Sequence, residues 1–290
     1  MLSHLSKFIN NFIIIFFLSV VPFTVFSEEK NINFIETNWS FHGLFGTFDR
    51  ASLQRGYQVY QEVCSGCHSV QHLSYRNLSE KGGPEFSIEE AKAIASQFEV
   101  EDGPNSDGEM FLRSARLSDK FVKPYPNVQA STAANGGAYP PDMSVLAKAR
   151  TGGADYIHSL LLGYEEAPAG FELDDGVYYN KYMPGNKIKM SEPISDGIVE
   201  YTDGTEASKE QISKDVTTFL VWASEPHLES QHRMGFKTIL YLIILIILVY
   251  MSKQKVWSRF GSKIEEQDET FDKVEKVVTE YEGEDPKTFK

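Results

Sequence analysis

The chain has 290 residues, 41% of them hydrophobic and 24% charged, a composition typical of a folded protein and not of a disordered chain or a polytopic membrane protein. Its formal net charge is −13, which argues against a nucleic-acid-binding protein because such proteins need a basic face. The two cysteines, Cys64 and Cys67, are too few for a multi-disulfide scaffold or for a zinc or iron–sulfur site held by four thiolates of this chain.

An apolar run at the N-terminus has the pattern of a secretory signal peptide. Lys7 supplies a short positive region, Phe12 to Phe26 form the apolar core, and Ser27 ends an acceptable small-residue cleavage site. We therefore predict a signal peptide over residues 1–27. An uncleaved anchor helix is the alternative, since residues 8–27 carry no charge.

Residues 28–232 are predicted to form the exported domain. They contain 31 acidic and 17 basic residues, so essentially all of the negative charge of the chain lies in this part. Such a surface favours solubility and attracts a cationic partner.

A second apolar segment, residues 233–252, predicts a transmembrane helix. Its uncharged centre, Thr238–Ser252, includes nine Ile and Leu residues and rises about 22 Å as a helix. Lys237 can extend its ammonium group to the interface, which lengthens the span to about 28 Å. Four bases follow with no acid among them: Lys253, Lys255, Arg259 and Lys263. The positive-inside rule then predicts that residues 253–290 are a cytoplasmic charged tail, partly disordered or helical on a partner.

The segment Cys64-Ser65-Gly66-Cys67-His68 has the spacing C-x-x-C-H. In this spacing two thiols add across the vinyl groups of a haem, and the following histidine coordinates the iron. A disulfide or a redox C-x-x-C pair is the alternative. Because both cysteines of the chain lie in the motif and the domain is predicted to be exported, we predict one covalently attached haem c, with Cys64, Cys67 and His68 as its attachment and ligand residues.

Two amphipathic helices are predicted around the haem. Residues 49–63 place Leu53, Tyr57 and Tyr60 on one helical face. Gly56 costs this helix about 1 kcal/mol relative to alanine, a cost that a close helix crossing would justify. A second helix is predicted from Ser208 to about Glu225, with an apolar stripe at Ile212, Val216, Phe219, Leu220 and Ala223. Glycine and proline dominate the middle of the chain. The expected fold is mainly α, a class I c-type cytochrome with long loops, plus one C-terminal transmembrane helix.

The second axial ligand must come from a loop that reaches the far face of the haem. Met183 and Met190 both qualify, and the residues alone do not separate them. His42 and His158 satisfy the spacing as well, although each is more typical of a surface or packing residue. A methionine ligand favours Fe(II) and raises the potential, whereas a second imidazole lowers it.

Several uncommon strings give the chain a resemblance to the cytochrome c1 family, the haem subunits of quinol–cytochrome c reductase (cytochrome bc1) complexes. The resemblance runs from Trp39 to about Trp257 and rests on Arg55–Tyr60 before the motif, Asp102–Asn105, Lys123–Asn127, Ala133–Ala138, Pro140–Ser144 and Glu225–Pro226. It implies that Met190 is the axial methionine opposite His68 and that Met183 is the second choice. It also implies that Arg150 pairs with a haem propionate and that Tyr156, Asn135 and Pro141 line the haem crevice.

The resemblance further implies single-electron transfer and no enzymatic activity of the chain by itself. The Rieske iron–sulfur protein would donate the electron, a soluble or tethered cytochrome c would accept it, and cytochrome b would be the membrane partner in a dimeric complex. The expected location is the bacterial inner membrane, with the haem domain periplasmic. Two acidic groups offer a docking field for basic cytochrome c, with a merely solvated acidic face as the alternative: Glu99, Glu101, Asp102, Asp107 and Glu109, and the pair Glu165 and Glu166.

Two other functions fit the motif without this resemblance. One is a haem enzyme or gas sensor with five-coordinate iron and a distal polar residue such as His158. The other is a stand-alone membrane-anchored electron shuttle that joins no complex.

Overall fold

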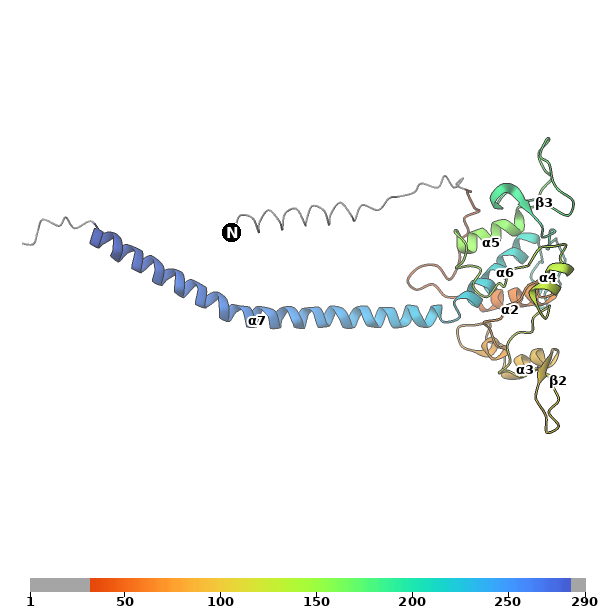
Figure 1. The fold of residues 1–290 in the computed structure, drawn as a ribbon, viewed down its shortest axis with the longest axis horizontal. Coiled ribbons are helices and arrows are strands. Elements are labelled where there is room, and N and C mark those ends of the chain that lie inside the picture. Colours follow the sequence, from red (N-terminus) through yellow and green to blue (C-terminus); the bar gives the residue numbers. More distant parts are fainter. Residues whose placement is uncertain (1–31, 283–290) are drawn as a thin grey trace, which may run out of the picture. The chain divides into compact units, whose positions relative to one another are not determined.

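Two helices, Arg50–Val59 and Lys209–Ser224, cross each other, and their crossing organises the core (Figure 1). The structure is a computed structural model that describes residues 32–282, without the side chains of residues 259–269 and 277–282. The predicted signal peptide, residues 1–27, lies outside the described residues. From Phe34 onward the chain forms one unit, and this unit is mainly helical. The predicted fold class is confirmed.

Helix α2 spans Arg50–Val59 and leads directly into the C-x-x-C-H motif. The Asp49 carboxylate begins it by accepting the backbone amides of Ala51 and Ser52, as an N-terminal cap does. A π-helical turn, Tyr60–Cys64, follows, and Ser65 N donates to Tyr60 O at 2.8 Å. The predicted helix over residues 49–63 is therefore present, with a π turn as its last part.

Helix α6, Lys209–Ser224, crosses α2 at Gly56. A Cβ atom added to Gly56 would lie 2.1 Å from the carbonyl oxygen of Asp215 and 2.8 Å from Cβ of Phe219. Only glycine permits this approach, so the predicted close crossing is confirmed. Beside it, the fully buried carboxylate of Asp215 accepts from Arg55 Nε at 2.8 Å and from Ser52 Oγ at 2.7 Å. These bonds satisfy a buried charge and join the two helices.

The core around the crossing is built from aromatic rings. Tyr60 stacks on Phe219 with a ring-centroid distance of 5.5 Å, and Tyr75 stacks on Phe121 at 4.8 Å. Other helical elements surround this core: a 3₁₀ turn Tyr75–Ser79, α3 (Ile88–Ser96), α4 (Val128–Ala134), α5 (Gly153–Leu162) and a 3₁₀ turn Pro184–Asn186. Helix α5 packs against α6, so both sides of α6 are covered by helices.

The strands of the described chain form two small antiparallel hairpins. Strands β1 (Glu99–Asp102) and β2 (Phe111–Ser114) pair with Glu99 opposite Ser114, and β3 (Tyr178–Tyr179) and β4 (Lys187–Ile188) pair with Tyr178 opposite Ile188. Long loops connect these elements, as the glycine and proline content predicts.

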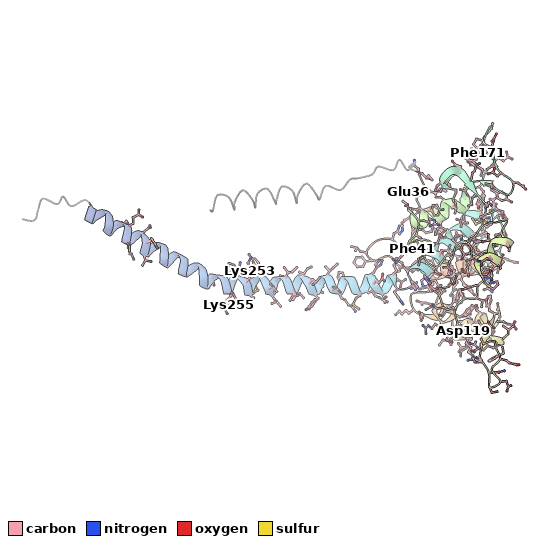
Figure 2. The ribbon with its side chains drawn as sticks, in the orientation of Figure 1. Glu36, Phe41, Asp119, Phe171, Lys253 and Lys255 are labelled. Atoms are coloured by element: carbon pink, nitrogen blue, oxygen red, sulfur yellow. The ribbon has the colours of Figure 1, made fainter. Side chains whose placement is uncertain are left out.

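Helix α7 runs from Leu228 to Glu282. Among the described residues, its segment Leu228–Ser258 is the one helix long and apolar enough to cross a membrane, and its most apolar stretch is not buried against the rest of the protein. It contains the predicted span, residues 233–252. Figure 2 shows the side chains of Lys253 and Lys255 projecting from α7 beyond this span. The helix continues to Glu282, so most of the predicted tail is helical.

Candidate functional site

The π turn at the end of α2 presents the two cysteines of the motif. The backbone bends back so that Cys67 N and His68 N both donate to Cys64 O, at 3.1 and 2.9 Å. Both cysteines are free thiols, Cys67 is exposed, and the enclosed position of Cys64 raises the pKa of its thiol to about 12. A redox C-x-x-C pair needs a lowered thiol pKa, so this environment disfavours the redox alternative.

His68 is fixed by a backbone carbonyl. Its Nδ1 lies 2.9 Å from Pro141 O. Because a carbonyl oxygen only accepts, Nδ1 carries the proton of the neutral ring and Nε2 keeps its lone pair. Burial lowers the pKa of His68 and favours this neutral form. The tautomer with a bare Nε2 is the one that ligates iron, and a carbonyl bond to the other nitrogen is the usual orienting contact of a metal-bound histidine.

The segment Pro141–Ser144 is itself held against the residues that follow the motif. The Asp142 carboxylate accepts from Ser69 Oγ at 2.7 Å and from Gln71 N at 3.1 Å. Ser144 Oγ accepts from His72 N at 3.0 Å. Pro141, predicted from the resemblance as a crevice residue, therefore acts on His68 through its carbonyl oxygen. Sequence reasoning missed Asp142 and Ser144, although both stand in the string Pro140–Ser144.

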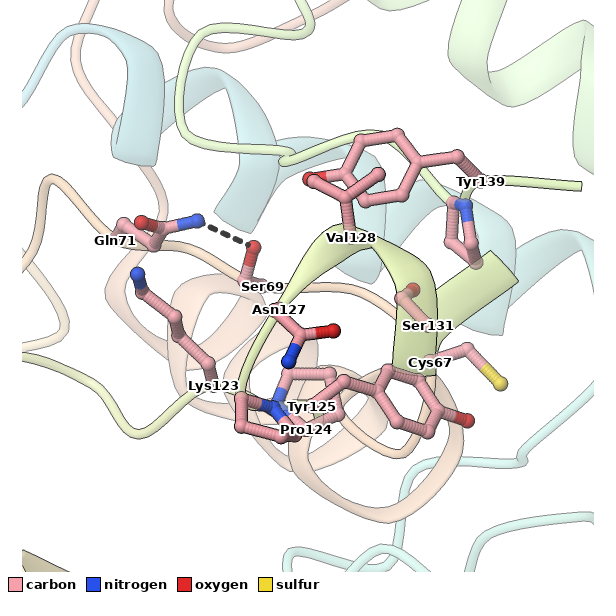
Figure 3. Close-up of a pocket in the computed structure, with 12 residues that line it drawn as sticks. Cys67, Ser69, Gln71, Lys123, Pro124, Tyr125, Asn127, Val128, Ser131 and Tyr139 are labelled. Atoms are coloured by element: carbon pink, nitrogen blue, oxygen red, sulfur yellow. Dashed lines mark hydrogen bonds between the residues drawn. The ribbon is translucent and has the colours of Figure 1, made fainter. Parts of the chain in front are cut away.

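A shallow pocket opens beside Cys67 (Figure 3). Its walls come from three stretches of chain. The first is Cys67 of the motif with Ser69 and Gln71 after it, the second is Lys123–Asn127 before α4 with Val128 and Ser131 in α4, and the third is Tyr139 with Pro140. Two tyrosines, Tyr125 and Tyr139, and several prolines supply apolar surface. Apolar surface beside Cys67 suits the face of a porphyrin, which needs apolar contact. His68, Met183, Met190 and Arg150 are not among the residues that line this pocket.

Asn135 ends α4 at the edge of this pocket. Its side-chain amide donates to Ser131 O at 2.7 Å, and Ser131 lines the pocket. The Gly136 carbonyl that follows accepts a hydrogen bond from Lys189 Nζ at 3.3 Å. This contact joins the turn after α4 to the residue that precedes Met190.

The two candidate methionines have different surroundings, and both are half-buried. Met183 Sδ lies 3.8 Å from the hydroxyl of Tyr156, a buried residue of α5. Met190 follows β4, and its carbonyl accepts from Tyr164 Oη at 3.0 Å. The contact of Met183 is therefore through its side-chain sulfur, with Tyr156. The contact of Met190 is through its backbone carbonyl, with Tyr164. The pair of His68 and Met190 stays a prediction.

Arg150 is exposed immediately before α5. Its Nη1 donates to Ala149 O at 3.1 Å, and Gly153 N donates to Arg150 O at 3.0 Å in the turn that begins the helix. An exposed guanidinium with several remaining donors has the chemistry for a bidentate bond to a propionate. That role also stays a prediction.

His158 lies between helices. It is 6% exposed, its Nδ1 is 2.9 Å from Ser213 Oγ of α6, and its ring meets Trp39 edge-on at a centroid distance of 5.6 Å. Burial lowers its pKa, which keeps it neutral. This is the environment of a packing residue that joins α5 to α6, which agrees with the interpretation of His158 as a packing residue and not as an iron ligand.

The first acidic group belongs to one hairpin. Glu99 and Glu101 are exposed on β1, and Asp107 and Glu109 are exposed in the turn after it. Asp102 differs, because Arg113 of β2 forms an ion pair with it. The acids of this group that remain available to a partner are therefore Glu99, Glu101, Asp107 and Glu109. In the second group, Glu165 lies 3.7 Å from Lys181 Nζ.

The crossed helices, the attachment motif and the oriented histidine define a c-type cytochrome. The chain belongs to the cytochrome c1 family, whose sequence model matches residues 39–260. It is 48% identical over 239 residues to cytochrome b/c1 of Bradyrhizobium diazoefficiens, a match that covers 76% of this chain and only 35% of that longer protein. It is 46% identical over 225 residues to the mitochondrial heme protein cytochrome c1-2 of Solanum tuberosum, covering 78% of this chain and 85% of the relative. The mitochondrial cytochrome b-c1 complex catalytic subunit of Candida albicans is 47% identical over 222 residues, 76% of each chain. Haem c is the cofactor of this family.

Proposed function

We propose that this chain is the haem-bearing electron-transfer subunit of a membrane quinol–cytochrome c reductase complex. The observation that carries the proposal is the bond between His68 Nδ1 and Pro141 O, next to two free cysteines in C-x-x-C-H spacing. It orients the imidazole and leaves Nε2 bare, which suits a permanent axial ligand. The Candida albicans relative is named as a subunit of such a complex, which supports the same assignment here.

Each site residue has a defined task in this proposal. Cys64 and Cys67 would hold the haem through thioether bonds, and His68 and Met190 would supply the protein ligands of its iron. Arg150 balances the charge of a propionate. Haem c supplies the one-electron couple when bound. The residues of this chain move no proton, because electron transfer needs neither a general acid nor a general base here.

The partners follow from the charge and the membrane span. We assign electron entry to the Rieske iron–sulfur protein and electron exit to cytochrome c, which the exposed acids Glu99, Glu101, Asp107 and Glu109 would attract. Helix α7 anchors the chain beside cytochrome b, in a dimeric complex. The bases after the span, among them Lys253 and Lys255 (Figure 2), favour a cytoplasmic C-terminus and a periplasmic haem domain in a bacterial inner membrane.

Purification and gene disruption together test this function. The full chain with an affinity tag should co-purify with cytochrome b and the Rieske protein, and membranes that lack it should lose quinol-dependent cytochrome c reduction. Expression of the wild-type chain should restore the rate, whereas the variant Cys67→Ala, which cannot form the second thioether, should restore it poorly. A chain that purifies alone, with cytochrome c reduction unchanged in its absence, would favour the stand-alone shuttle.

A further inference from the structure

Between Trp39 and Phe48 the chain forms a closed loop, called here the 40–47 loop. Thr47 N donates to Ser40 O at 3.0 Å, and Gly46 N donates to Gly43 O at 3.2 Å. A Cβ atom on Gly46 would lie 2.2 Å from a backbone carbonyl oxygen of the same loop, so the turn requires glycine at this position. The loop therefore has a defined conformation.

The tip of the 40–47 loop is apolar and exposed. Leu44 is 78% exposed and Phe45 is 76% exposed. The arms of the loop are buried instead, since Trp39 and Phe41 stack at a centroid distance of 5.4 Å and are 3% and 4% exposed (Phe41 is labelled in Figure 2). Buried aromatic residues thus hold the arms of the loop in the domain, and two large apolar side chains at its tip are exposed to solvent. Adjacent exposed apolar residues on a formed turn indicate a contact surface.

Three contacts fix this loop against the first turns of α7. Phe48 N donates to Glu229 Oε1 at 2.9 Å, and a ring nitrogen of His232 lies 3.2 Å from Gly46 O. At the tip, the rings of Phe45 and Phe236 lie 6.0 Å apart between centroids. The loop tip is therefore held level with Phe236.

Phe236 lies just before the uncharged stretch Thr238–Ser252 of α7. It precedes Thr238 by two residues, which is about 3 Å along a helix. Arg233 and Lys237 are exposed at the same level, while the two nearby acids are already paired, Glu225 with Lys148 and Glu229 with Arg50. Exposed bases beside exposed Phe and Leu side chains are the composition of the membrane interface, where bases meet lipid phosphates and aromatic residues reach the acyl boundary.

We propose that the 40–47 loop is a second membrane contact of this chain, which inserts Leu44 and Phe45 into the interface of the bilayer that α7 crosses. The inference rests on the membrane anchor of the proposed function. A single helix leaves a domain free to tilt and to rotate about the helix axis. A second contact beside the helix fixes the orientation of the haem domain, and with it the direction in which the haem faces its redox partners.

Accessibility of a spin label tests this inference. The haem-loaded full chain, with the subunits that co-purify with it, would be reconstituted in vesicles of phosphatidylcholine and phosphatidylglycerol. Because Cys64 and Cys67 are consumed in thioethers, a new cysteine is the one reactive thiol of the chain. Labels would be placed with Phe45→Cys, with Phe111→Cys on the exposed face of β2 as the aqueous control, and with Ile243→Cys inside the α7 span as the lipid control.

Molecular oxygen concentrates in lipid, and a water-soluble nickel chelate stays outside it. The inference predicts that the label at position 45 is accessible to oxygen and several-fold less accessible to nickel than the label at position 111. Equal nickel accessibility at 45 and 111, with a lipid-like label at 243, would overturn the inference and leave the anchor intact. Shielding of position 45 from both reagents would also overturn it, since a protein partner would then cover the loop. Accessibility of the label at position 243 to nickel would contradict the membrane anchor, and with it the inference.

Discussion

The Nδ1 atom of His68 lies 2.9 Å from the carbonyl oxygen of Pro141, and this contact joins the attachment motif to a segment 73 residues further along the chain. In the proposed function Cys64 and Cys67 would determine where the haem binds, but they do not orient the histidine ring. The Pro141 carbonyl does so, and the hydrogen bonds around Asp142 determine where that carbonyl lies.

Removing the Asp142 carboxylate should destabilise this arrangement. The variant Asp142→Ala leaves Ser69 Oγ and the amides of Gln71 and Ser144 without their acceptor, which should lower the free energy of unfolding by about 1–3 kcal/mol. Chemical denaturation of the haem-loaded protein measures the change. The matched control is Asp107→Ala in the exposed hairpin turn, which should change stability by less than about 0.5 kcal/mol. Equal effects of the two variants would show that the 141–144 segment does not depend on Asp142.

A methyl group at the helix crossing should be strongly destabilising. In the variant Gly56→Ala, the new Cβ meets Asp215 O at 2.1 Å, so α2 and α6 must move apart. We expect a loss of about 1–3 kcal/mol or more, although alanine is the better helix former by about 1 kcal/mol. The control is Gly235→Ala in α7, where no atom lies within 4 Å of the new Cβ. Thermal unfolding followed by circular dichroism compares them, and a melting temperature of Gly56→Ala at or above wild type would contradict the crossing.

Glu229 predicts a pH dependence of stability. Burial opposes its charge, but the bonds from Arg50 and the amide of Phe48 outweigh burial and lower its pKa. A carboxylate whose folded pKa lies below its unfolded value, about 4.3, stabilises the fold above that pH and loses this contribution as pH falls through the folded pKa. The variant Glu229→Gln should therefore be less stable than wild type at pH 7, by about 1 kcal/mol because Arg50 is partly exposed. The difference between the two denaturation curves should start to shrink as pH falls below about 4.3 and should vanish below the folded pKa of Glu229. A difference that does not shrink below about pH 4.3 would contradict the assignment.

The exposed hairpin acids should accelerate electron transfer to cytochrome c. Reversing two charges in Glu99→Lys/Glu101→Lys should reduce the second-order rate at low ionic strength by about tenfold and flatten its salt dependence. Stopped-flow reduction of a basic cytochrome c measures both. The control variant is Glu210→Lys in the first turn of α6, which lies outside both acidic groups and should change the rate little. If the double variant behaves like the control, the hairpin is only a solvated acidic face.

The sequence predicts those features that depend on short-range chemistry. The C-x-x-C-H spacing, the apolar stripe of α6 and the cost of Gly56 in a helix are local patterns, and each has one good structural explanation. The bond from His68 to Pro141 could not be predicted in this way, because it depends on how a loop without periodicity folds back on the motif. Residues alone likewise do not separate Met183 from Met190, since the two flank a 3₁₀ turn and the two-residue strand β4, elements too short to have a sequence periodicity. The helical tail up to Glu282 was ambiguous because its composition is charged.

The optical spectrum of the oxidised, haem-loaded full chain tests the central claim most directly. A charge-transfer band from methionine sulfur to iron should appear at the red edge of the spectrum of wild type. It should be lost in Met190→Leu and kept in Met183→Leu, which makes the same chemical change on the other side of β4. Loss of the band in Met183→Leu alone would show that Met183, and not Met190, is the iron ligand. Absence of the band from wild type would contradict the assignment of a high-potential electron-transfer haem with histidine and methionine ligands.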